Sequence, residues 1–191
     1  MRRARKYSRY LCYGGGVALN CVTNSTIYHM FEKVWIMPNP GDAGGSLGAA
    51  AAYLNKPLNW KGPYLGTNIK NKINPRQVAR HIFDHSVCGV ANGPAEFGPR
   101  ALGNRSLLGD PRRDIKDTVN EIKRRQKFRP FAPAILEEWA YSYFRGPMNE
   151  YMQYVAQAQH DFNAVTHVDG TARVQIVKKD CPSVLRQILE E

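Results

Sequence analysis

The sequence predicts a mixed α/β protein, and three observations support this fold class. Segments with the composition of buried strands alternate with segments whose apolar residues recur at helical spacing. The first strand-like segment leads through three glycines into a helix-like segment, an order typical of α/β folds. The chain has 191 residues, of which 43% are hydrophobic, which is enough for one good-sized domain or two small ones.

The first third of the chain shows this alternation most clearly. Its last helix is rich in alanine, and such small side chains should allow close packing. In chain order we expect a strand at residues 7–13, a glycine turn at 14–16, a helix at 17–31, a strand at 34–36, a loop at 37–45 and a helix at 46–54.

A polar segment rich in glycine, proline and asparagine follows at residues 56–74 and has the composition of a linker. Asn74 and Pro75 then predict a helix start, because asparagine caps helices and proline fits the first helical position. We expect that helix to end near His85. The later elements should be a strand at 87–90, a glycine- and arginine-rich loop to about 110, a helix at 113–125, an extended segment at 128–136, a helix at 137–144, a strand at 151–158, a strand–turn–strand unit at 165–177 and a helix at 182–189.

The charge balance points to an anionic ligand. The net charge is +11 and the isoelectric point is about 9.7, so the chain should attract nucleic acid, nucleotides, phosphorylated metabolites or an acidic partner. A basic surface without any specific ligand is the alternative, since charge alone names no ligand. Many of the basic residues fall between Arg100 and Arg129, among glycines, prolines and phenylalanines.

Cysteine spacing and hydropathy exclude several classes. The four cysteines form no CxxC pair, so neither a zinc knuckle nor a disulfide scaffold is indicated. No apolar run approaches the roughly 20 residues that cross a bilayer, and no apolar signal segment follows the basic residues 1–6. We therefore expect a cytoplasmic protein with reduced thiols and no membrane partner.

Two glycine-rich turns are candidate ligand contacts. In GGGVALN, residues 14–20, glycines between a strand and a helix let backbone N–H groups approach a nucleotide, or simply turn the chain. In PGDAGGS, residues 40–46, Asp42 is either a helix N-cap or a metal ligand, with the helix start beyond it facing phosphates.

The stretch GPAEFGPRALGNRS, residues 93–106, is a candidate phosphate site. Its glycines and prolines make a rigid loop that carries Arg100 and Arg105, and guanidinium groups match phosphate oxygens two at a time. Glu96 is a candidate to orient one of these arginines.

A second basic stretch, KRRQKFRPFAP at residues 123–133, has two interpretations. It either binds nucleic acid, with Phe128 and Phe131 stacking on bases, or closes a pocket for a small polyanion. Farther on, Asp169-Gly170 predicts a hairpin turn, and Arg173 in the strand after it could point into the same anion site.

Five stretches, taken together and in this order, resemble the ATP-dependent O-carbamoyltransferases of the nodulation and antibiotic-tailoring type. They are GGGVALN, PGDAGGSLGAA, GPAEFGPRALGNRSLLGDPR, KRRQKFRPFAPA and HVDGTARVQ. The resemblance implies that residues 1–60 are the C-terminal portion of an actin-like, sugar-kinase-like carbamoyl-transfer domain. It further implies a linker at 61–73 and a C-terminally truncated YrdC-like domain at 74–191.

The resemblance also implies an activity. In this family the YrdC-like domain uses ATP, with Mg²⁺, to convert carbamoyl phosphate to carbamoyl-adenylate, and pyrophosphate is released. The actin-like domain then transfers the carbamoyl group to a hydroxyl of a small molecule, sugar or nucleotide. A bound metal, typically iron, assists that transfer.

The resemblance assigns roles residue by residue. Asp42 is implied to be one metal ligand. Nucleotide contacts of the first domain are implied for Gly14, Gly15, Gly16, Asn20, Gly44 and Gly45. A catalytic pocket for carbamoyl phosphate and the adenylate is implied to be lined by Arg100, Arg105, Lys123, Arg125, Arg129 and Arg173.

Departures from the family pattern shape the expected partners. No HxxxH metal pair precedes Gly14; His81 and His85 have that spacing but lie beyond the linker. The phosphate-binding first half of the actin-like domain has no counterpart either, so a second chain or self-association is expected to complete that domain. A basic RNA- or DNA-binding module, or a non-catalytic partner-binding remnant of the family, is the alternative.

Overall fold

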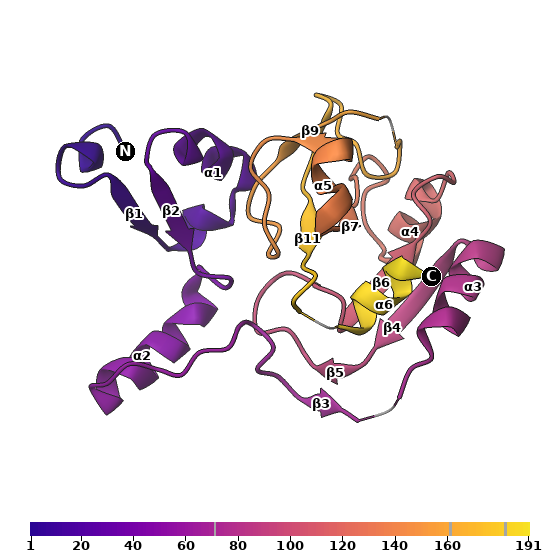
Figure 1. Cartoon of the computed structure of the whole chain (residues 1–191), viewed down its shortest axis with the longest axis horizontal. Coiled ribbons are helices and arrows are strands. Elements are labelled where there is room, and N and C mark those ends of the chain that lie inside the picture. Colours follow the sequence, from indigo (N-terminus) through magenta and orange to yellow (C-terminus); the bar gives the residue numbers. More distant parts are fainter. Residues whose placement is uncertain (71, 161, 182) are drawn as a thin grey trace.

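A computed structural model describes residues 1–70, 72–160, 162–181 and 183–191 (Figure 1). It is 32% helical and 19% strand, which confirms the mixed α/β class. The N-terminal elements lie to one side of the chain and the elements from residue 75 onward to the other (Figure 1).

The N-terminal part is built on two parallel strands, β1 (Tyr10–Tyr13) and β2 (Lys33–Ile36), joined by a short 3₁₀ helix η2 (Gly16–Leu19) and helix α1 (Cys21–Tyr28). The predicted order of strand, glycine turn, helix and strand is confirmed. The single helix predicted at 17–31 is wrong, because Asn20 has extended backbone angles between η2 and α1. The Asn20 side chain instead caps α1, accepting a hydrogen bond from the N–H of Thr23 at 3.1 Å.

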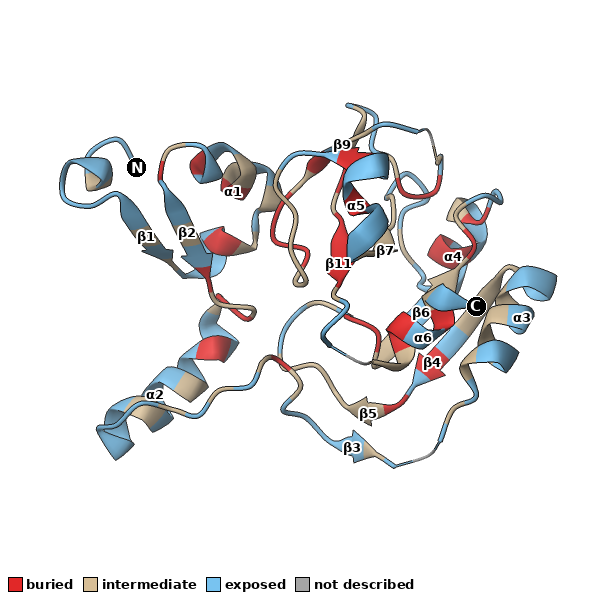
Figure 2. Cartoon of the chain, viewed as in Figure 1, coloured by how far each residue is buried: buried red, intermediate tan, exposed pale blue. Residues whose placement is uncertain are grey.

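Helix α2 (Gly45–Leu54) follows a 3₁₀ turn, η3 (Asp42–Gly44), and projects from the rest of the chain (Figure 1). None of its residues is buried, and Tyr53 is 91% exposed (Figure 2). Its small side chains would still permit close packing, but no other described segment buries a residue of α2.

In the C-terminal part, α3 (Pro75–His85) starts as predicted, with the side chain of Asn74 accepting from the N–H of Gln77 at 3.3 Å. Strand β4 (Val87–Ala91) pairs antiparallel with β6 (Arg105–Gly109), and α6 (Val184–Glu190) lies against α3. Strand β6 was missed, since its sequence is part of the predicted long loop. A short pair, β3 (Asn68–Ile69) with β5 (Gly93–Pro94), shows that the end of the polar segment is structured.

The remaining described elements of the C-terminal part include two further small sheets. In chain order these elements are α4 (Lys116–Ile122), β7 (Ala134–Leu136), α5 (Glu137–Tyr143), β8 (Phe144–Arg145), β9 (Ala156–Ala158), β10 (Thr171–Ala172) and β11 (Gln175–Val177). Strand β7 is parallel to β11, and β9 lies between β8 and β10. The predicted strand–turn–strand at 165–177 is wrong. The Asp169-Gly170 turn forms, and the N–H of His167 donates to the carbonyl of Thr171 at 2.8 Å, but the residues before the turn form no strand and β10 pairs with β9. Residue 182, the predicted start of the last helix, lies outside the described residues.

Buried polar contacts join the two parts of the chain. Asn24, which is 0% exposed, donates from Nδ2 to the carbonyls of Ala18 at 2.8 Å and Gln153 at 2.9 Å. Gln153 donates from Nε2 to the carbonyls of Ile36 at 3.1 Å and Met37 at 2.8 Å. Because segment 149–155 packs on the N-terminal strands, the two parts share one interior.

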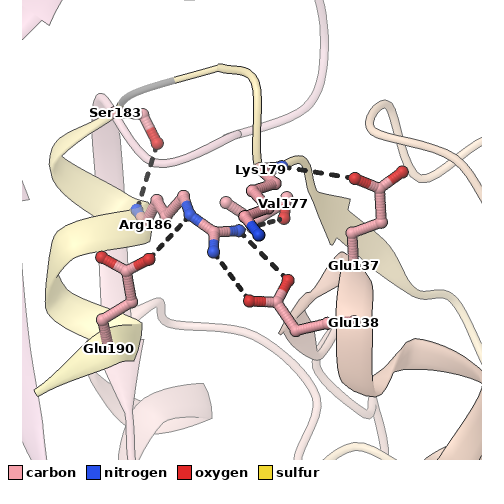
Figure 3. A network of polar contacts seen from close by, with 7 residues as sticks. All are labelled: Glu137, Glu138, Val177, Lys179, Ser183, Arg186 and Glu190. Carbon is pink, nitrogen blue, oxygen red and sulfur yellow. Dashed lines mark hydrogen bonds and ion pairs between the residues drawn. The ribbon is translucent and has the colours of Figure 1, made fainter.

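Helix α6 is fixed by a buried arginine (Figure 3). Arg186 donates from Nη2 to Glu138 on α5 at 2.7 Å and from Nη1 to the carbonyl of Val177 at 3.2 Å, and its Nε lies 2.8 Å from Glu190. Ser183 caps the helix by accepting from the N–H of Arg186 at 3.1 Å. Every edge of this guanidinium therefore has a partner.

We expect Asn24→Ala to lower the free energy of unfolding by about 2 kcal/mol, because two buried carbonyls lose their donor. The control Thr26→Ala removes only an exposed side-chain contact on the same helix and should change it by less than about 0.5 kcal/mol. Urea unfolding measures both values. Equal values for the two variants would show that the junction contributes nothing specific to stability.

Candidate anion-binding site

A cavity of about 1060 Å³ lies in the C-terminal part of the chain, bordered by α3, β6, α4 and α6. Four of the six predicted basic site residues line it: Arg100, Lys123, Arg125 and Arg173. They come from three segments far apart in sequence. The structure therefore brings most of the predicted cationic set to one place.

Arg100 lies in the loop between β5 and β6, and Glu96 orders that loop. The Oε1 atom of Glu96 accepts hydrogen bonds from the backbone N–H groups of Leu102 at 2.7 Å, Asn104 at 2.9 Å and Arg105 at 3.3 Å. Glu96 was predicted to orient an arginine side chain, but its bonds go to this backbone instead.

Gly103 in the same loop has no room for a larger residue. Its φ angle of +115° favours glycine, and an added Cβ would lie 2.9 Å from Leu185 on α6. The glycine therefore lets the loop approach the helix that forms one wall of the cavity.

Arg105 contacts the protein itself. Its Nη1 donates to the carbonyls of Asn92 at 2.6 Å and Asn104 at 2.7 Å, and its Nη2 donates to those of Thr67 at 2.7 Å and Gly93 at 3.2 Å. Arg105 is not among the cavity-lining residues. These contacts join the β3–β5 pair to β6, and a direct contact of Arg105 with phosphate stays a prediction.

Arg100 links the cavity to the N-terminal part. Its Nη2 donates to the carbonyl of Leu19 at 3.0 Å, at the end of η2. The first glycine turn lies at the other end of η2, where the N–H of Gly15 donates to the carbonyl of Pro40 at 2.7 Å. The two predicted glycine-rich turns are therefore neighbours. Their contact with a nucleotide, predicted for Gly14, Gly15, Gly16, Asn20, Gly44 and Gly45, stays a prediction.

Arg125 follows α4 and stacks on an aromatic wall. Its guanidinium lies 4.4 Å from the ring centre of Phe131, and burial lowers its pKa, as does the charge of Arg129. Arg129 is exposed and does not line the cavity, although it affects Arg125 electrostatically. Its predicted contact with the substrate stays a prediction.

Arg173 is the most perturbed cation. Burial and the charges of Arg100 and Arg125 lower its pKa to about 10, while Cys21 acts in the opposite direction. Its buried Nε has no hydrogen-bond partner within the described part of the chain. No ion pair between described residues includes Arg100, Arg125 or Arg173. An anion entering the cavity would therefore meet three guanidinium groups that no described carboxylate pairs with, although Asp110 and Glu191 also line the cavity.

Apolar residues also line the cavity, with Phe83, Ile115, Val119, Leu185 and Ile188 among them, beside further charged residues such as Asp110, Arg112 and Glu191. A cationic end and apolar walls in one cavity suit a ligand with both phosphate and a ring or other apolar portion. The sequence did not predict that α6 lines the cavity, because the helix carries no chemical motif.

A metal site at Asp42 lacks a ligand set. No group of three or more His, Cys, Asp or Glu side chains among the described residues could hold a metal ion. Iron, and Asp42 as one of its ligands, therefore stay predictions from the resemblance. No helix in the described part of the chain is long and apolar enough to span a membrane.

We expect Arg173→Met to raise the free energy of unfolding of the ligand-free chain by about 1 kcal/mol, because it removes a buried charge without a partner. The folded pKa is depressed, so this cost is fully present at pH 7, begins to fall only as the pH rises through about 10, and ends only above the higher pKa of the unfolded chain. Thermal unfolding of both chains at pH 7 measures the difference. A variant that is less stable at pH 7 would contradict the assignment.

Comparisons with known proteins agree with the motifs. The family model described as "Carbamoyltransferase C-terminus" matches residues 79–191, and "Carbamoyltransferase N-terminus" matches residues 1–51. Nodulation protein NolO of Bradyrhizobium diazoefficiens is 35% identical over 93% of this chain and 39% of its own length. Nodulation protein U of Azorhizobium caulinodans is 34% identical over 100% of this chain and 38% of its own.

An uncharacterized protein of Synechocystis is 34% identical over 95% of this chain and 39% of its own. The chain thus spans about two fifths of the length of these curated relatives. Because one family model covers more than half of the chain and the relatives exceed 30% identity along nearly all of it, the chain belongs to the carbamoyltransferase family.

Proposed function

We propose that the cavity is the carbamoyl-activating site of an ATP-dependent O-carbamoyltransferase. It would bind ATP with Mg²⁺ and carbamoyl phosphate. Water would release inorganic phosphate from carbamoyl phosphate, and the resulting carbamate would attack the α-phosphate of ATP to give carbamoyl-adenylate and pyrophosphate. One observation carries the proposal: three arginines without acidic partners among the described residues converge on one cavity in a chain of this family.

The charge distribution suits adenylate formation. Attack at the α-phosphate places negative charge on that phosphate and on the leaving pyrophosphate, and preorganised guanidinium groups stabilise both. Arg173, buried and without a partner at Nε, is suited to the phosphate that lies deepest, while Lys123 is exposed at the rim. The roles differ because burial strengthens an electrostatic contact and exposure weakens it.

The apolar lining residues would protect the carbamoyl-adenylate after it forms. A carbamoyl-adenylate is a mixed anhydride that water hydrolyses, so a site that excludes water protects it.

In the same proposal, residues 74–191 belong to a YrdC-like domain and residues 1–60 to the end of an actin-like domain. Transfer to a hydroxyl of a small molecule, sugar or nucleotide would involve the part of the relatives that this chain does not match. No step is assigned to a metal, because the described residues provide no ligand set.

The exposed N-terminal surface supports a protein partner. Helix α2 is apolar and uncharged along its length yet has no buried residue, and Trp35 on β2 is 59% exposed. Parallel strands are normally covered on both faces, and helices apolar all round are normally buried. A second chain or a second copy of this one would cover this surface and complete the actin-like domain.

The activity proposal predicts carbamoyl-phosphate-dependent release of pyrophosphate from ATP and Mg²⁺ by the purified chain. Arg125→Ala should slow this release about 100-fold or more, because the charge on the leaving group loses a stabilising partner. The control Arg145→Ala removes an exposed arginine that does not line the cavity, and should change the rate less than about twofold.

Release that does not depend on carbamoyl phosphate, or that survives Arg125→Ala, would contradict the proposal. A folded chain that releases no pyrophosphate would also contradict adenylation by this chain alone. A steep salt dependence of duplex RNA binding would then support the nucleic-acid alternative.

The partner proposal predicts reversible self-association of the isolated chain, because exposed apolar surface of this kind associates when no other partner is present. Tyr53→Asp with Leu54→Asp should shift the mass in sedimentation equilibrium toward the 21.6 kDa of one chain. The control Tyr7→Asp changes a residue that is 90% exposed outside α2 and should have no effect. A wild-type chain that is monomeric at every concentration would contradict self-association and leave a different chain as the partner.

A further inference from the structure

Asn120 is a buried polar residue whose contacts all go to the basic segment that follows it. It lies on α4 and is 0% exposed. Asparagine is a poor helix former and is rarely buried, so its side chain must have good partners to be stable there. Nothing in the local sequence pattern around Asn120 marks a site.

The Asn120 side chain uses three hydrogen bonds. Its Nδ2 donates to the carbonyl of Lys127 at 3.0 Å and to that of Arg129 at 2.9 Å. Its Oδ1 accepts from the Nε of Arg125. The backbone carbonyl of Asn120 also accepts from the N–H of Arg125 at 3.0 Å, so one residue determines the path of the segment and the direction of one guanidinium.

Arg125 is consequently fixed on two sides. Asn120 binds its Nε edge, and Phe131 lies against its face. Phe131 is itself anchored, since its N–H donates to the carbonyl of Ala164 at 2.8 Å and its ring packs on the cluster that contains Ile115. The Nη atoms of Arg125 have no hydrogen bond or ion pair with any other described residue, and Arg125 lines the cavity. Both Nη nitrogens, with four N–H donors, are thus left for an anion.

We propose that Asn120 is a positioning residue that presents the Nη edge of Arg125 to a phosphate group in the cavity. The inference rests on the proposed function of that cavity. A neutral amide suits this role, because a carboxylate at the same place would pair with Arg125 and reduce the positive charge available to a ligand. Replacing a neutral acceptor with a carboxylate would also end the two bonds to the carbonyls of Lys127 and Arg129.

The test is a double-mutant cycle for binding of inorganic pyrophosphate to the full chain, measured by titration calorimetry. Arg125→Ala and Asn120→Ala should each raise the dissociation constant about tenfold, the effect of one charged hydrogen bond. If Asn120 acts through Arg125, the double variant should also be about tenfold weaker than wild type instead of about a hundredfold. In a chain that already carries Arg100→Ala, the change Asn120→Ala should still raise the dissociation constant about tenfold.

Thr118→Ala on the exposed side of α4 is the matched control and should leave binding unchanged. If Asn120→Ala does not fold by circular dichroism, Asn120→Ser keeps a polar group in the same place and enters the same cycle. Additive effects of the Asn120 and Arg125 changes would overturn the inference, as would an Asn120 variant that binds as wild type.

The outcomes separate the two proposals. A folded wild-type chain that binds neither pyrophosphate nor ATP contradicts the proposed function of the cavity. Normal binding that depends on Arg125 but not on Asn120, or on each of them independently, contradicts only the positioning role.

Discussion

Three guanidinium groups share one cavity without a carboxylate among the described residues to neutralise them, and the surrounding structure has to tolerate that charge. Arg173 shows the cost, since burial and the charges of Arg100 and Arg125 lower its pKa. The groups that hold the other two arginines are neutral. Asn120 and Phe131 contact Arg125, and the carbonyl of Leu19 accepts a hydrogen bond from Arg100, so both arginines keep their charge. Such a site is ready for an anion before the anion arrives.

Two other arginines show the opposite arrangement. Arg186 is buried and paired with Glu138 and Glu190, and Arg105 donates to four backbone carbonyls. Both join elements that are distant in sequence, and neither retains a full edge for a ligand. Buried and partly buried arginines of the described chain thus include some that stabilise the fold and some that face the cavity. The two groups of arginines differ in the hydrogen-bond and ion-pair partners of their guanidinium groups.

Much of the local structure could be predicted because local signals determine it. The cap formed by Asn74 with Pro75 fixed the start of α3, and the glycine turn identified the β1–α1 unit. What failed depends on distant contacts. Strand β6 carries glycine and arginine but pairs with β4, and β10 pairs with β9 across a longer loop than the Asp169-Gly170 turn suggested.

The site shows the same division. Arginine and lysine in glycine- and proline-rich segments predicted an anion site, and the fold brings Arg100, Lys123, Arg125 and Arg173 to one cavity. Arg105 and Glu96 could not be assigned from sequence, because their partners are backbone groups that only the folded loop brings near. Asn120 gave no signal either, since its importance comes from three bonds to residues 125–129.

The most direct measurement is a crystal structure of the chain with a non-hydrolysable carbamoyl-adenylate analogue. The account predicts α-phosphate oxygens within about 3 Å of nitrogen atoms of Arg173 and Arg125, with the Nε of Arg173 acquiring the partner that it lacks among the described residues. An analogue bound elsewhere, or bound in the cavity without an arginine contact, would contradict the central claim.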